Sequence, residues 1–250
     1  NLEFPDLLQQ NPGWKQSDSR NMNFGFTGSA YWLRFEFENK TGHDVYITAN
    51  MIKGDIINLY LPGNNGKYLT KKGGNLFPVS HRELQDKDEY FKIPYSPVKQ
   101  TIYIKIRSTY LCAFTPEILP LEKIIEKNNK LLPAYWAYYG LLVTIIFTNL
   151  LIFIIVREKN NLLFVFLVFF YLLVDTSHDG FFSMFIYSEN PAFGDKVFMV
   201  SCGLIGFLAG LFFQEILETR RKFRKIHMLF NLYIFAFAVL TAVSFFTDKS

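Results

Sequence analysis

Residues 134–156 read AYWAYYGLLVTIIFTNLLIFIIV, and this stretch decides what kind of fold the chain can adopt. It contains no Asp, Glu, Lys or Arg, and it is as long as the roughly 20 residues that a helix needs to cross a bilayer. Unpaired backbone groups are costly in hydrocarbon, and the stretch lacks the alternating polarity of a barrel strand. The sequence therefore predicts a transmembrane helix.

Three further apolar runs follow, at about 162–177, 197–217 and 226–246, so we expect an α-helical transmembrane region of about four spans over residues 134–250. In the third span Gly203, Gly206 and Gly210 share one helix face, which favours close packing within the bundle over a dimer seam. Asn149 and Asn231 lie inside spans, where we expect hydrogen bonds between helices.

The loop charges predict the orientation of these spans. Arg157 and Lys159 follow the first span, and five Lys or Arg residues lie within 220–225, between the third and fourth. The loop between the second and third spans is mainly acidic. Because basic loops stay inside the cell, the N-terminal region is predicted to lie outside. That topology requires an export signal, so we expect a removed signal peptide or a fragment.

Residues 1–120 carry strand patterns of period two, at 30–39, 44–49, 55–61 and 101–108, with turn residues at 62–66. Apolar side chains alternate with polar or bulky ones. Several short strands with such turns predict an all-β jelly roll or sandwich with a single core. Residues 121–133 read as a short helical connector, with Pro133 where the first span begins.

The outward faces of these strands offer a candidate ligand site that combines flat rings with forked donors: Trp32, Arg34, Tyr60, Tyr103 and Arg107. Sugars suit such a surface, because their CH faces stack on rings while their hydroxyls take hydrogen bonds. The alternative is that Trp32 packs under a loop and the arginines make surface ion pairs.

Chemistry beyond binding is not indicated. The sequence has no phosphate loop, no HExxH, no nucleophile elbow and no Cys cluster at metal spacing, so we expect no enzyme activity, cofactor or metal in this chain. Cys112 and Cys202 fall in different halves and are not expected to pair. His178 with Asp175 and Asp179 could form a proton- or cation-responsive site, although a solvated loop histidine is the commoner case. The basic loop at 220–225 is expected to contact anionic membrane lipids rather than nucleic acid.

Several segments resemble one family of membrane receptors. They are NFGFTGSAYWLRF at 23–35, LYLP at 59–62, PVSHR at 78–82, and residues 138–150 with the basic turn that follows. Together they are similar to the bacterial 7TM-DISM receptors with the second class of extracellular domain. The resemblance implies a jelly-roll sensor similar to carbohydrate-binding modules, in the bacterial inner membrane, before a seven-helix unit that relays to a cytoplasmic output domain. About four spans and no output domain are present, so we expect a truncated chain.

The leading hypothesis is a non-enzymatic sensor that binds a small, carbohydrate-like ligand outside and relays it through the membrane helices. The alternatives are a transporter or channel component with an accessory outer domain, and a membrane-tethered lectin. A transporter would favour paired intramembrane charges and broken helices, which these spans do not show beyond Asp175.

Overall fold

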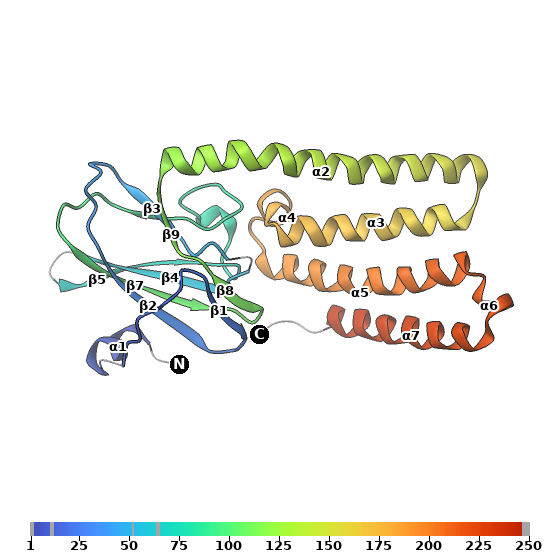
Figure 1. Cartoon of the computed structure of the whole chain (residues 1–250), viewed down its shortest axis with the longest axis horizontal. Helices are drawn as coiled ribbons and strands as arrows, with labels where there is room; N and C mark the ends of the chain where they lie inside the picture. Colours follow the sequence, from blue (N-terminus) through green and yellow to red (C-terminus); the bar gives the residue numbers. More distant parts are fainter. Residues whose placement is uncertain (1–2, 11–12, 52, 64–65, 247–250) are drawn as a thin grey trace. The chain divides into compact units, whose positions relative to one another are not determined.

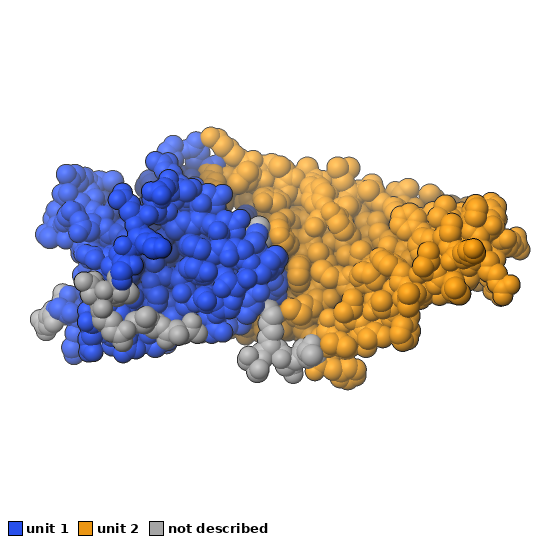
Figure 2. Space-filling view, turned by 60° about the horizontal axis from the view of Figure 1, so that its bottom comes forward, with its two compact units in different colours: residues 1–126 blue, residues 127–250 orange. Residues whose placement is uncertain are grey.

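The computed structural model describes residues 3–10, 13–51, 53–63 and 66–246. The chain divides into two compact units, residues 1–126 and 127–250, coloured blue and orange in Figure 2. Each unit is described by itself below. The predicted turn at 62–66 includes Asn64 and Asn65, which lie outside the described residues.

The first unit contains an antiparallel β-sandwich (Figure 1). One sheet has the order β2 (Ala30–Phe37), β7 (Gln100–Arg107), β4 (Ile56–Pro62) and β5 (Tyr68–Gly73). A second sheet has the order β6 (Phe91–Ile93), β3 (Val45–Thr48) and β9 (Glu117–Pro120). A two-stranded ribbon pairs β1 (Met22–Phe26) with β8 (Leu111–Phe114), and the short helices α1 (Phe4–Gln10) and η2 (Val79–His81) complete the unit.

The period-two alternation explains the sandwich core. In the β2–β7 pair Leu33 lies opposite Ile104, and Phe35 lies opposite Ile102. These side chains join one apolar cluster with residues of β3, β4, β6 and β8. The predicted inward faces of β2 and β7 are therefore confirmed. In β7, however, all five residues from Ile102 to Ile106 are buried, so its other face is covered as well.

The second unit is helical and contains the four predicted spans. Its long helices are α2 (Leu121–Val156), α3 (Lys159–His178), α5 (Pro191–Ile216) and α7 (Arg224–Phe246), and each is long and apolar enough to cross a membrane. The first six residues of α2 belong to the first unit. Two short helices, α4 (Phe181–Phe185) and α6 (Thr219–Lys222), lie in the loops. The expected connector at 121–133 and the first span form one continuous helix, α2, which begins directly after β9. Pro133 lies inside this helix and does not end it.

The glycine face of α5 packs closely within the bundle, as predicted, and its partner is α7. A Cβ atom on Gly206 would lie 2.1 Å from Cδ1 of Phe237, and one on Gly203 would lie 2.3 Å from Oγ1 of Thr241. Only glycine allows this approach. Asn231 on α7 makes the expected hydrogen bond between helices, because its Oδ1 accepts from Gln214 Nε2 on α5 at 2.8 Å.

The prediction for Asn149 was wrong. Its Nδ2 donates to the carbonyl of Ile145 at 2.9 Å, one turn earlier in the same helix. An amide inside a helix can satisfy its donor on its own backbone. Asn149 therefore does not need a neighbouring helix as a partner.

Candidate ligand-binding surfaces

A groove opens where the sandwich has two unpaired edges. β2 is the edge strand of the four-stranded sheet and β9 is the edge strand of the three-stranded sheet. Between them lies a space of about 1440 Å³ that reaches core residues such as Phe35 and Ile118. Because no backbone ladder closes the sandwich here, the gap is bordered by side chains.

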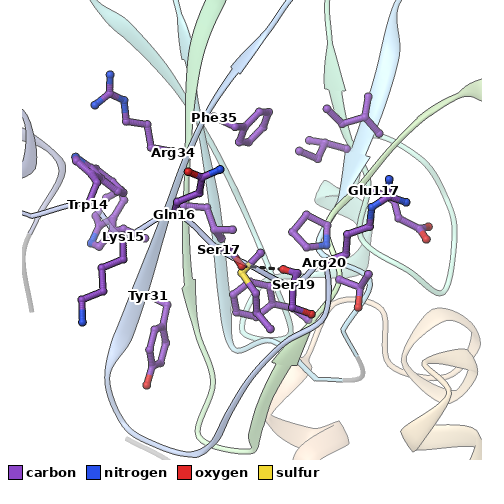
Figure 3. Close-up of a pocket in the computed structure, with 18 of the residues that line it drawn as sticks. Trp14, Lys15, Gln16, Ser17, Ser19, Arg20, Tyr31, Arg34, Phe35 and Glu117 are labelled. Atoms are coloured by element: carbon purple, nitrogen blue, oxygen red, sulfur yellow. Dashed lines mark hydrogen bonds between the residues drawn. The ribbon is translucent and has the colours of Figure 1, made fainter.

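The lining of this groove combines rings with charged and hydroxyl groups. The segment 14–20 contributes Trp14, Lys15 and Arg20. Figure 3 shows Trp14, Lys15 and Arg34 on one side of the view, and Arg20 and Glu117 on the other. Ser17 Oγ donates to the carbonyl of Ser19 at 2.7 Å, which shapes the segment between them. A groove of this size and composition suits an elongated polar ligand with apolar faces.

A second surface lies on the face of the four-stranded sheet that points away from the core. Trp32 on β2 is in register with Lys105 on β7, and Tyr103 on β7 is in register with Tyr60 on β4. The rings of Trp32, Tyr60 and Tyr103 gather with that of Tyr68 on β5 into an aromatic cluster. Burial raises the pKa of both Tyr60 and Tyr68 above the usual tyrosine value.

Helix α1 covers this aromatic face. Phe4 stacks on Tyr60 with ring centroids 4.0 Å apart and an interplanar angle of 11°. Leu7 is 4% exposed, and Tyr60 and Tyr103 are 5% and 8% exposed. Just before the helix, Glu3 Oε1 accepts from Lys105 Nζ at 2.7 Å. The face that sequence reasoning expected to be open to ligands is therefore covered by the chain's own N-terminal segment.

The five predicted site residues separate into three places. Trp32 and Arg34 line the groove, and Trp32 also packs against the aromatic cluster. Tyr60 and Tyr103 belong to the cluster beneath α1. Arg107 is half-buried at the end of β7, opposite Ala30 and Ile56, outside the groove lining and the cluster. The structure thus brings four of the five residues onto adjoining surfaces.

Sequence reasoning missed the residues that precede the first strand. Phe4 and Leu7 lie three positions apart, a helical spacing that was a usable signal. Trp14 is a large ring in a polar segment, another signal that could have been followed. Lys105 was assigned to the outward face of its strand, but nothing in the pattern shows that this lysine is 8% exposed.

A third constellation lies where the middle of α2 meets the C-terminal end of α3, at the ends of the first two spans that the charge pattern places outside. Tyr139 donates its hydroxyl to Asp179 Oδ2 at 2.6 Å, and Tyr138 donates to Asp175. His178 Nδ1 lies 3.4 Å from Asp179 Oδ1. The carboxylates of Asp175 on α3 and of Asp179 directly after it are thus both engaged by tyrosines of α2. The described residues form no cluster that could hold a metal ion. This pattern ties the two helices together at one end.

Neither Cys112 nor Cys202 is in a disulfide in the part of the chain that the structure describes. Cys112 is buried in the sandwich core and Cys202 lies on α5. Burial raises the pKa of the Cys112 thiol above its usual value, so this residue is an inert core group.

Comparison with known families gives a match for each unit. A family described as 7TMR-DISM extracellular 2 matches residues 1–119, and a family described as 7TM diverse intracellular signalling matches residues 133–250. A comparison with curated proteins gave no match. The two matches follow one another along the chain in the order that the sequence resemblance implied.

Proposed function

The chain belongs to the 7TMR-DISM family of receptor-like signalling proteins, and from this premise we propose that its sandwich senses a small, carbohydrate-like ligand outside the cell. In this proposal the membrane helices relay binding to a cytoplasmic output domain. The chain itself acts as a sensor and transducer without catalysis. Its place is the inner membrane of a bacterium, where it spans the bilayer several times.

The observation that carries the proposal is the groove between β2 and β9. It offers rings for stacking in Trp14 and Trp32, and forked donors in Arg20 and Arg34. Sugar rings present CH faces and hydroxyls in the same molecule, so they match both kinds of group. Tyr60 and Tyr103 continue the row of rings on the outer face of the sheet, where α1 covers them. Arg107 stays part of the proposed site as a donor at the end of β7.

The groove also supports a route for the relay. Glu117, Ile118 and Leu119 of β9 line it, and α2 begins at Leu121, directly after this strand. A ligand that shifts β9 therefore acts on the first residues of a membrane helix without an intervening loop. Such a ligand drives a response only if it binds one arrangement of β9 and α2 more tightly than the other.

The ligand test uses the full chain in lipid nanodiscs, titrated with a panel of oligosaccharides and metabolites by calorimetry. Trp14→Ala and Arg34→Met should each weaken binding of a genuine ligand about tenfold or more, as expected for a stacking ring or a charged hydrogen bond. Lys40→Met is the matched control, because Lys40 is exposed in the turn after β2 and lies outside the groove. Binding that tolerates Trp14→Ala and Arg34→Met as well as Lys40→Met would place the site elsewhere.

Thiol labelling in intact spheroplasts tests on which side of the membrane the sandwich and the basic loop at 220–225 lie. Both native cysteines are first replaced by serine. Lys40→Cys should react with an impermeant reagent before lysis, and Lys222→Cys should react only after lysis. The basic loop is expected inside because lysines and arginines cluster in cytoplasmic loops. The opposite labelling pattern would reverse the proposed topology.

A further inference from the structure

We propose that the outer face of the four-stranded sheet binds a ring that carries a carboxylate, and that Glu3 and Phe4 occupy this face as an intramolecular competitor. The inference deepens the proposed sensing function and rests on it. It identifies a second subsite beside the groove, the chemical class of its ligand, and the segment that must leave before the ligand can bind.

Phe4 is surrounded by aromatic rings in the way that a ring-shaped ligand would be in a binding site. Its ring stacks face to face on Tyr60, and it meets the ring of Tyr68 edge-on at 5.0 Å and that of Tyr103 edge-on at 5.5 Å. The ring of Trp32 lies 6.0 Å away at an angle of 28°. One side chain thus touches four aromatic side chains that come from four different strands. Such an arrangement holds a flat six-membered ring, whether aromatic or pyranose.

Lys105 supplies the charge selectivity of this face. Its side chain is 10% exposed, and its Nζ contacts Glu3 at 2.7 Å and lies 5.5 Å from the centre of the Trp32 ring. Glu3 itself is 65% exposed at its side chain, so the carboxylate reaches in from solvent. A buried ammonium requires an anionic partner. When the N-terminal segment leaves, the carboxylate of a ligand can take the place of Glu3.

Two polar atoms on the same face have no partner among the described residues. Trp32 Nε1 and Asn58 Oδ1 are buried without a hydrogen bond. Asn58 is in register with Lys105, which is in turn in register with Trp32, so the three side chains lie in one row across the sheet. Phe4 is apolar and cannot satisfy the indole donor or the amide acceptor. A ligand with hydroxyl groups can satisfy both, which gives it an advantage over the phenyl ring.

The competitor is suited to leave. Helix α1 has seven residues, fewer than an isolated helix needs for stability in water, so its folding depends on contact with the sheet. Of its side chains, Phe4 and Leu7 pack into the aromatic cluster, while Leu8 is 47% exposed. The helix is held to the sheet mainly through Phe4 and Leu7, so a ligand that replaces the contacts of these side chains can displace it.

The charge and ring requirements together define the ligand class as a six-membered ring bearing a carboxylate. Two sources share this chemistry, a sugar acid within an oligosaccharide and an aromatic carboxylate. The unpartnered donor and acceptor favour the sugar acid, because its hydroxyls can pair with Trp32 and Asn58. The apparent affinity of the chain for this ligand is the affinity of the open face multiplied by the fraction of molecules in which α1 has left it.

The experiment measures binding to the full chain in nanodiscs with three probes: trigalacturonate, phenylacetate and the neutral galactotriose. Calorimetry gives the affinity, and hydrogen exchange of residues 4–10 reports whether α1 leaves the sheet. We expect trigalacturonate to bind at least tenfold more tightly than galactotriose and to speed exchange in α1. Tighter binding of phenylacetate than of trigalacturonate would identify the aromatic source instead.

Variants separate the competitor from the site. Phe4→Ala should tighten trigalacturonate binding at least tenfold, because it removes the competing ring, whereas Leu8→Ala on the exposed side of α1 should leave it unchanged. Lys105→Met should abolish the preference for a carboxylate, and Lys105→Arg should retain it. Hydrogen exchange in β4 and β7 checks that each variant keeps its sheet.

The outcomes also distinguish failure of the second subsite from failure of ligand sensing through the groove. If no carboxylate probe binds more tightly to Phe4→Ala than to the unchanged chain, the intramolecular competitor does not exist. A ligand whose binding depends on Trp14 and Arg34 but not on Phe4 or Lys105 would support sensing through the groove while overturning the second subsite. Binding of all three probes with equal affinity would overturn the carboxylate requirement.

Discussion

Arg82→Met is a sharp test of what holds the sandwich together. Arg82 Nε lies 3.2 Å from Glu89 Oε2, and the two side chains are only 6% and 10% exposed. The guanidinium also donates from Nη1 to the carbonyls of Asp86 and Lys87, at 2.7 and 3.1 Å. Methionine keeps much of the side-chain volume but removes the charge and every one of these donors. Glu89 would then be a buried carboxylate without its cation.

The expected loss is large at neutral pH. Removing one partner of a buried ion pair costs about 3 to 5 kcal/mol, a substantial part of the roughly 5 to 15 kcal/mol that stabilises a typical domain. Burial already raises the pKa of Glu89 above its usual value, and the nearby Arg82 offsets only part of that rise. Without Arg82 the pKa of Glu89 rises further. The folded protein then holds this proton more tightly than the unfolded chain does, so lowering the pH towards 5 restores stability.

Hydrogen exchange of strand β6 in the full chain gives the free energy of opening as a function of pH. Arg82→Met should lose most stability at pH 8 and regain part of it at pH 5, and Arg82→Met/Glu89→Gln should lose much less than the single variant. Lys40→Met breaks the exposed pair with Glu38 and should cost no more than about 1 kcal/mol. A loss in Arg82→Met that is no larger than in Lys40→Met, or that does not vary with pH, would refute this reasoning.

Three further results are expected. Gly206→Ala should destabilise the helical unit by about 1 to 3 kcal/mol in detergent titrations because its Cβ would clash with α7, whereas Gly140→Ala should be tolerated because nothing lies within 4 Å. Tyr139→Phe leaves Asp179 without its 2.6 Å partner and should cost about 1 to 3 kcal/mol, seen as faster exchange at the end of α3 and the start of α4; unchanged exchange would show that the bond is dispensable. Cys112 should resist alkylation at pH 8 in the folded chain and react on denaturation, and rapid labelling before unfolding would contradict its burial.

Periodic patterns made the main elements predictable. The strands at 30–39 and 101–108 were found because one side of each faces an apolar core, and this constraint places apolar side chains at every second position. The four spans were found because the bilayer requires long uncharged helices. The short strands β6 and β9 have only three and four residues, too few to establish a period.

The candidate site was only partly predictable, because a strand pattern tells which side chains leave the core but not what covers them. Tyr103 and Lys105 alternate with the inward isoleucines of β7, so the pattern assigns them to solvent. In the structure α1 packs over them from about 100 residues earlier in the chain. Long-range cover of this kind leaves no local signal at the strand, although the Phe4 and Leu7 spacing marks the covering helix.

The two candidate surfaces are linked through shared residues. Trp14 and Trp32 line the groove and also pack against the aromatic cluster under α1. Trp14 follows α1 by only four residues, so a ligand that displaces α1 also moves a ring of the groove. Linkage then requires that a ligand in the groove alter the affinity of the outer face by the same factor as the reverse. Only the groove includes β9, the strand that continues into α2. Occupation of the outer face can therefore influence the membrane helix most directly by changing how the groove binds.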